Sequence, residues 1–409
     1  MTERLHAPEL LAPAGGREQL EAAILYGADA VYLGGSELSL RAKCEGFDGP
    51  ALEEAVRYAH SAGVRVYYCL NALPFDRHIP AVESVLEGLP NLGVDALIAA
   101  DPGVIRLALR RCPSLPIHLS TQAHSANAQA AAFWKEAGIS RINLARELDK
   151  EAASALIHRF PDLEFELFVH GAMCLSLSGH CLISAWVNNR PANLGLCTQP
   201  CRFDYRGIAL TVEEALRHDG PFLEIRQGET FSGIWAPQDL CLVRWIRDIL
   251  ALAPAALKLE GRTKSGGYVG QVTDVYRTAI DEASAHHAVS AGSLVRELLH
   301  SASRPLCSGF FLPERFVEPI PKDFRPRPVV ARLLEPAGSG AWRVQVRSLW
   351  NAREAASLLL PGMRRPRLEA GSYTLENHRG ERVDELHPGT MGILHCCLDG
   401  LRPGLYIRA

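Results

Sequence analysis

The sequence lacks the features that mark several common protein classes. No apolar run reaches the roughly 20 residues of a membrane-spanning helix, and Met1–Leu11 lacks the charged head and apolar stretch of a signal peptide. Nothing resembles a Walker loop, a Ser-His-Asp signature or an HExxH metal motif, and the glycine patterns are too weak for a dinucleotide fingerprint. The formal net charge is only −3, so the chain as a whole does not signal nucleic-acid binding. We therefore expect a cytoplasmic protein outside these motif-defined classes.

The order of apolar segments predicts an α/β fold. The chain has 409 residues, which is longer than one domain usually is. Of these residues, 47% are hydrophobic. Up to about residue 290, short apolar segments alternate with amphipathic stretches such as Glu18–Tyr26, Ala51–Ala62, Ala126–Ala137 and Gln238–Ala251. Eight strands favour a TIM-like (β/α)8 barrel over a doubly wound open sheet. The expected strands are Glu9–Ala12, Ala30–Gly34, Val64–Leu70, Ala96–Ala100, Ile117–Ser120, Arg141–Ala145, Leu163–Val169 and Ala256–Glu260.

The remaining chain is predicted to form an insertion, a linker and a second domain. After the seventh strand no helix is expected before about Pro237, so residues 171–236 form an insertion over the barrel mouth. We expect the barrel domain over residues 1–305, a proline-rich linker over 306–328 and a small all-β barrel over 329–409. From Phe311 onward, basic side chains outnumber acidic ones. This excess is either suited to contacts with phosphates or a chance asymmetry of a solvated surface. Strands of the last domain are expected at Val329–Leu334, Trp342–Ser348, Ser372–Glu376, Met391–Cys396 and Leu405–Arg408.

Cysteines gather in the insertion. The chain has 11, which is many for a reducing compartment where structural disulfides are rare. Four follow the spacing Cys174-x6-Cys181-x15-Cys197-x3-Cys201, and Cys241 comes later. Four thiolates are the usual ligands of an iron–sulfur cluster, and zinc also accepts them. Because the paired C-x2-C spacing of structural zinc is missing, we favour an iron–sulfur cluster, with zinc and unligated thiols as alternatives.

Polar residues follow several of the expected strands, where barrel enzymes place catalytic and binding groups. His170 either donates a proton or fixes the neighbouring loop. Asp101 suits a helix cap as well as a binding role, and Arg146 and Glu147 could simply pair with each other. The expected set is Asn71, Asp101, Gln122, Arg146, Glu147, His170, Lys258, Glu260, Arg262 and Lys264.

The end of the eighth strand predicts an anion site. Alternation along the strand puts Lys258 and Glu260 on the same side. Arg262 and Lys264 follow at the start of a helix, where cationic side chains and backbone N–H groups attract anions. A substrate carboxylate or phosphate would suit this position.

Four motifs resemble the U32 family, which is named for peptidases. They are ELLAPAG at Glu9–Gly15, GADAVYLG at Gly27–Gly34, HGAMC at His170–Cys174 and LKLEGRTKS at Leu257–Ser265. Within the family the chain is most similar to the branch that takes part in tRNA hydroxylation, on the stretches Ile117–Ala123, Phe133–Trp134 and Arg146–Leu148 and on the C-terminal β-domain. The resemblance covers nearly the whole chain.

The resemblance implies an oxygen-independent RNA hydroxylase. It implies 5-hydroxyuridine formation at the tRNA wobble position (U34), with prephenate as co-substrate, whereas other branches modify a 23S rRNA cytidine or the ubiquinone ring. It also implies a 4Fe–4S cluster on Cys174, Cys181 and Cys197, with either Cys201 or Cys241 as the fourth ligand. From their positions at the strand ends, His170, Glu260, Arg262 and Glu147 are the expected catalytic residues. Asn71, Asp101, Gln122, Arg146, Lys258 and Lys264 are expected to bind substrate.

Two other functions are weighed against the hydroxylase. A peptidase needs an activated nucleophile or a metal-bound water, and the sequence displays no arrangement for either. A cluster-bearing scaffold that binds RNA or protein is also conceivable, but the polar residues expected at the barrel mouth count against it.

Overall fold

The computed structural model describes residues 7–36, 38, 44–173, 197–200, 226–227, 232–233, 238–288, 290–314 and 316–409. Most of the expected insertion lies outside these residues, including Cys174, Cys181 and Cys201. Within it, β8 (Arg226–Gln227) pairs with β9 (Ser232–Gly233). No helix among the described residues has the length and apolar character needed to cross a membrane.

Among the described residues, eight parallel strands close into a barrel, which confirms the predicted fold class. Strand β11 closes it by pairing with both β1 and β7. The strands are short and almost entirely buried, as expected when side chains fill the barrel and helices cover it. In order around the barrel they are β1 (Glu9–Pro13), β2 (Ala30–Leu33), β3 (Arg65–Leu70), β4 (Ala96–Ala99), β5 (Ile117–Leu119), β6 (Arg141–Asn143), β7 (Glu164–Ala172) and β11 (Ala256–Leu259).

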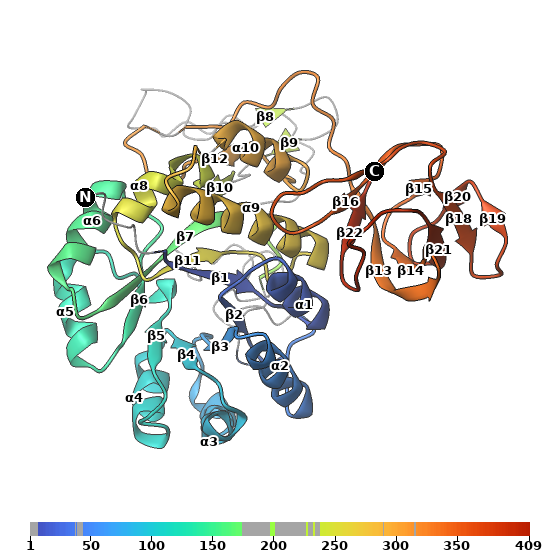
Figure 1. Cartoon of the computed structure of the whole chain (residues 1–409). Coiled ribbons are helices and arrows are strands. Elements are labelled where there is room, and N and C mark those ends of the chain that lie inside the picture. The colour runs from blue at the N-terminus through green and yellow to red at the C-terminus, as the bar shows by residue number, and fades with distance from the viewer. Residues whose placement is uncertain are drawn as a thin grey trace.

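Helices between the strands form the outer layer (Figure 1). Several begin at a side-chain cap, because Asp101, Asn127, Asp149 and Ser265 each accept a backbone N–H of the first turn. Gly63 ends one helix with φ of 72°, a conformation that favours glycine. The helices are α1 (Arg17–Leu25), α2 (Pro50–Ser61), α3 (Ile79–Gly88), α4 (Pro102–Arg111), α5 (Ala128–Glu136), α6 (Lys150–Arg159), α8 (Ile246–Ala251), α9 (Gly266–Ser284) and α10 (Ala291–Leu299), with 3-10 turns η1 (Asp76–His78), η2 (Leu89–Leu92), η3 (Thr121–Ala123) and η6 (Val243–Trp245).

The region after β7 differs from the prediction of a helix over Gln238–Ala251. Its first part is strand β10 (Asp239–Cys241), which pairs antiparallel with the end of β7. Strand β7 runs beyond the barrel to Ala172, and β10 covers the edge that would otherwise be unpaired. Strand β12 (Leu306–Cys307) then pairs with β10, so the proline-rich segment that follows α10 begins against the barrel.

Residues 329–409, all described, contain an eight-stranded antiparallel sheet. Its strand order is β17-β16-β22-β13-β14-β21-β18-β19, and the fully buried Trp350 lies in its core cluster. All five predicted strands of this region are present, whereas β16 (Ala356–Leu359) and the two-residue strands β15, β17, β19 and β20 were not predicted. The strands are β13 (Val329–Gly338), β14 (Ala341–Val346), β15 (Trp350–Asn351), β16, β17 (Arg367–Leu368), β18 (Thr374–Asn377), β19 (Arg382–Val383), β20 (Glu385–Leu386), β21 (Met391–His395) and β22 (Tyr406–Arg408).

A buried ion network joins the C-terminal sheet to the barrel beside α1 and α9 (Figure 1). Glu297 of α10 accepts two hydrogen bonds from Arg408, at 2.9 and 3.0 Å, and one from Arg365 at 2.8 Å. Arg365 also donates to Asp274 of α9 at 2.7 Å. The two arginines lower the pKa of Glu297 against the opposing effect of its burial. Glu297 is therefore one of the electrostatic contacts that hold the two parts together, beside the pair of Arg332 with Glu21 of α1.

Replacing Glu297 with Gln is expected to destabilise the protein strongly. The change leaves the buried Arg408 without a carboxylate partner, which costs about 3–5 kcal/mol for a buried pair. Urea denaturation measures the loss. The matched control is Glu369→Gln, because Glu369 pairs with Arg367 at 3.2 Å between exposed side chains and should cost less than about 1 kcal/mol. Equal losses in both variants would contradict the assigned role.

Candidate active site

Arg146 connects three strand ends at the barrel mouth. It follows β6, and one of its guanidinium nitrogens donates to the Ala172 carbonyl of β7 at 2.6 Å. Another nitrogen lies 3.6 Å from the Glu260 carboxylate after β11. The guanidinium also stacks 3.8 Å above the Phe168 ring. Glu260 is therefore the ion-pair partner of Arg146, whereas Glu147, the neighbour in sequence, is exposed.

Cations and aromatic rings alternate across the mouth. Phe168 lies between Arg146 and Lys258, whose amino group is 5.5 Å from the ring centre. Lys258 is also 4.5 Å from the Tyr32 ring, and Arg262 lies on that ring at 5.8 Å. Stacking on aromatic faces stabilises positive charge that is removed from water. The barrel thus gathers three cationic side chains around two rings.

Carboxylates below this layer balance part of the charge. Glu166 of β7 accepts hydrogen bonds from Lys258 and Asn143, both at 2.8 Å. Arg141 lies 3.7 Å from Glu166 and donates to Glu9 at 2.8 Å. All of these side chains are buried inside the barrel. Lys258 therefore already has a carboxylate partner.

Arg262 lacks such a balance. Its residue is only 5% exposed, yet no carboxylate in the described part of the chain pairs with it. The backbone here is fixed by Gly15, where a side-chain carbon would lie 1.8 Å from the Arg262 carbonyl oxygen. The glycine of the ELLAPAG motif thus permits the close approach of two strand ends. A nearly buried, unpaired guanidinium is suited to bind an anionic group of a ligand.

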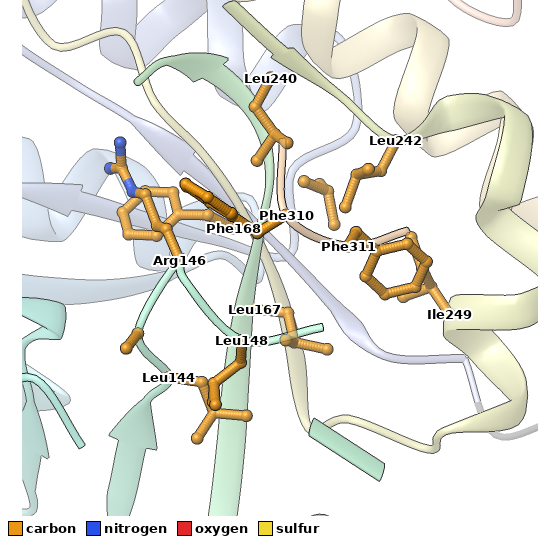
Figure 2. A pocket seen from close by; sticks show the side chains of 12 residues that line it. Leu144, Arg146, Leu148, Leu167, Phe168, Leu240, Leu242, Ile249, Phe310 and Phe311 are labelled. Carbon is orange, nitrogen blue, oxygen red and sulfur yellow. The ribbon is translucent and has the colours of Figure 1, made fainter. Parts of the chain in front are cut away.

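A small apolar cavity lies behind Arg146 (Figure 2). Its volume is about 30 Å³, which suits a water molecule rather than a nucleotide base. Phe168, Leu240, Phe310 and Phe311 contribute to its walls. Figure 2 shows the Arg146 guanidinium beside the Phe168 ring, on which it stacks, and on the far side of that ring from Phe311.

His170 and Lys264 lie on the helix side of the strands. His170 packs against Tyr276 of α9, whose hydroxyl is 3.5 Å from Nδ1, and burial lowers its pKa to about 4. It is therefore neutral at physiological pH. An irregular register between Lys258 and Leu259, opposite Phe168 and His170, explains how His170 turns away from the face that Phe168 occupies. The Lys264 amino group is 5.1 Å from the Tyr268 ring and 3.4 Å from the Ser303 hydroxyl.

Three other expected binding residues lie at separate strand ends. Asp101 caps α4 by accepting the Val104 N–H at 3.0 Å. The sequence had indicated this helix cap as the alternative to a binding role. Gln122 is buried in η3 after β5, where its side-chain oxygen accepts from the Ser120 hydroxyl. Asn71 is half-buried directly after β3.

Two of the cysteines considered as ligands are described. Cys197 is half-buried, and its sulfur accepts the Gln199 N–H at 3.3 Å. Cys241 is buried with its sulfur 3.9 Å from the Tyr276 hydroxyl of α9, and burial raises its pKa to about 12. Within the described residues no group of three His, Cys, Asp or Glu side chains is arranged for a metal ion. Cys241 thus faces the packed layer between sheet and helix.

Sequence reasoning missed Tyr32, Phe168 and the carboxylate layer. A signal was present, because Glu164 and Glu166 alternate with apolar residues within β7, and Arg141 begins an otherwise apolar strand. Charged residues inside a strand that is covered on both faces indicate a polar barrel interior.

The sequence model of peptidase family U32 matches residues 15–319. This chain belongs to peptidase family U32. The U32 protein is 38% identical over 311 residues to tRNA hydroxylation protein P of Helicobacter pylori, covering 75% of this chain and 72% of the relative. It is 34% identical over 337 residues to tRNA hydroxylation protein P of Escherichia coli, covering 74% of each.

More distant relatives carry other names. The 23S rRNA 5-hydroxycytidine C2501 synthase of Escherichia coli is 32% identical over 286 residues, which cover 69% of this chain and 40% of that protein. A solved U32 peptidase structure is 15% identical with a TM-score of 0.38, and it covers 63% of this chain and 94% of that one. This last likeness is too weak to bear on function.

In the U32 barrel, replacing Lys258 with Met is expected to destabilise the protein by about 3–5 kcal/mol, because Glu166 loses its nearest cation inside the barrel. The double variant with Glu166→Gln should recover part of that loss, as measured by urea denaturation in a double-mutant cycle. Lys135→Met is the control, since Lys135 forms a surface pair at 3.5 Å with Asp162. If the two losses in the free energy of unfolding were strictly additive, Lys258 and Glu166 would not interact energetically.

Proposed function

We propose that this U32 protein is an RNA hydroxylase that forms 5-hydroxyuridine at the wobble position of tRNA. Two relatives that are 34–38% identical over about three quarters of the chain are named tRNA hydroxylation protein P. The wobble base of tRNA is unpaired, so little energy is needed to bring it into an enzyme site. The observation in this chain that best supports a reaction site is Arg262 at the barrel mouth, which is nearly buried and has no carboxylate partner in the described part of the chain.

We propose a dicarboxylate such as prephenate as the co-substrate at this mouth. One carboxylate would pair with Arg262, and the second would lie within reach of Arg146, which shares its charge with Glu260. Guanidinium groups bind carboxylates through two parallel hydrogen bonds, which fixes the orientation of the ligand. Glu260 is placed to accept a proton near the bound ligand. His170, neutral and packed under α9, would support the strand end from behind.

A 4Fe–4S cluster on Cys174, Cys181, Cys197 and Cys201 is part of the proposal. Cys197 fits a ligand role because its sulfur already accepts a backbone N–H, as cluster sulfurs commonly do. The position of Cys241 against Tyr276 of α9 favours Cys201 as the fourth ligand. When bound, such a cluster supplies one-electron transfer.

Two alternatives have support in the comparisons. The relative named 23S rRNA 5-hydroxycytidine C2501 synthase keeps an rRNA cytidine open as the target base. The family name keeps peptidase activity as the second alternative. Hydroxylation of the ubiquinone ring is a further alternative, without support in the comparisons. Each names a product that can be measured.

Deleting the gene is expected to remove 5-hydroxyuridine from tRNA, as measured by mass spectrometry of digested nucleosides. Wild-type protein should restore the modification, whereas Glu260→Gln should not, because Arg146 would lose its carboxylate partner. An unchanged 5-hydroxyuridine level contradicts the proposal. Loss of 5-hydroxycytidine from 23S rRNA instead would make rRNA the substrate.

Binding of tRNA by the Glu260→Gln variant separates an enzyme from a scaffold. An enzyme should keep roughly its wild-type affinity for tRNA while losing modification, because Glu260 acts at the reacting end of the site rather than on the RNA backbone. Joint loss of binding and modification would favour the scaffold.

Anaerobically purified protein is expected to be brown and to contain about four irons per chain. Cys197→Ser and Cys201→Ser should lower the iron and sulfide content, and Cys241→Ser is the matched control that should keep both. Loss of iron in Cys241→Ser, with iron retained in Cys201→Ser, would show that the fourth ligand is Cys241 and not Cys201. Zinc in place of iron would contradict the cluster.

A further inference from the structure

The loop between β3 and α3 presents an aromatic side chain at the mouth side of the barrel. Phe75 follows the carboxyl end of β3 by a few residues and is 48% exposed. Ala72 in the same loop donates its N–H to the Leu38 carbonyl of the loop after β2. Because loops after barrel strands surround the mouth, Phe75 belongs to the face that carries Arg146 and Arg262.

The loop holds Phe75 in a defined position. Its backbone N–H donates to Nδ1 of His78 at 3.0 Å, and the His78 N–H donates back to the Phe75 carbonyl at 2.8 Å. The two rings lie 5.8 Å apart at 37°. The Arg77 guanidinium stacks on the Phe75 ring at 4.8 Å. The ring is therefore ordered before any ligand binds, which lowers the entropy cost of binding.

The charges around Phe75 suit a nucleotide. Among the described residues Arg77 makes no ion pair, although Asp76 is its neighbour, so its charge is open to a phosphate. Other exposed aromatic side chains differ in their surroundings. Phe316 packs on Trp245, and Arg244 beside it is held by Glu318. An exposed ring next to an unpaired guanidinium is the combination that binds unpaired bases by stacking.

We propose that Phe75, with Arg77 and His78, is a stacking platform for an unpaired base of the RNA substrate. This inference rests on the proposed function for the class of ligand. The platform would hold a base beside the mouth, while Arg77 contacts the adjoining phosphate. It would thereby position the loop of the RNA so that the reacting base reaches the co-substrate held at Arg262.

Binding of a fluorescently labelled anticodon stem–loop RNA to the purified protein tests the platform. Phe75→Ala and Phe75→Leu should each weaken binding about tenfold, since stacking of one base requires an aromatic ring. Phe75→Trp should bind roughly as the wild type does. Phe133→Ala is the matched control, because Phe133 is 60% exposed on α5, away from the strand-end loops, and its loss should leave affinity unchanged.

A second readout reports stacking itself. The base analogue 2-aminopurine, placed in turn at each loop position, should be quenched on binding at one position in the wild type, and that quenching should be lost in Phe75→Leu. Wild-type affinity and quenching in Phe75→Ala would overturn the platform, even if the protein hydroxylates RNA. Loss of affinity in Phe75→Leu without any quenching in the wild type would also overturn it. Phe75 would then make an apolar contact with the RNA without stacking on a base. Intact stacking with no 5-hydroxyuridine in cells would instead reject the proposed reaction and leave the platform standing.

Discussion

The balance of charge inside the barrel is the constraint on which the candidate site depends. Burying a cation is costly unless a carboxylate, a ring or a ligand compensates for the lost water. Lys258 has Glu166 at 2.8 Å, and Arg146 has Glu260 at 3.6 Å, whereas no carboxylate among the described residues pairs with Arg262, which lies on the Tyr32 ring. An anionic co-substrate would compensate for the positive charge of Arg262. We therefore propose Arg262 as the group that binds this anion, above the paired charges of Lys258 and Glu166.

Much of the barrel could be predicted from the sequence, because each strand is a short apolar segment bounded by turn residues. Strand β10 could not, since it forms only where β7 overruns the barrel and needs a partner. The Arg146–Glu260 pair is also a product of closure, which brings together residues that are far apart in sequence. The orientation of His170 depends on an irregular register, and no periodic pattern reports that.

The two parts of the chain meet through charge as well as apolar packing. Glu297 binds two arginines of the C-terminal sheet at the side of the barrel. The proposed RNA contact at Phe75 lies instead on a strand-end loop. A substrate as large as tRNA extends well beyond the mouth, so a fixed relation between the sheet and the barrel would present one continuous surface to it. The same buried network would then contribute to both stability and substrate fit.

Calorimetric titration of the purified protein with prephenate tests the central claim most directly. The account predicts saturable binding to the wild type, loss of that binding in Arg262→Met, and unchanged binding in Lys135→Met, which alters a surface ion pair. Equal prephenate affinity in the wild type and in Arg262→Met would contradict the account, because the unpaired guanidinium would then have no part in holding the anion.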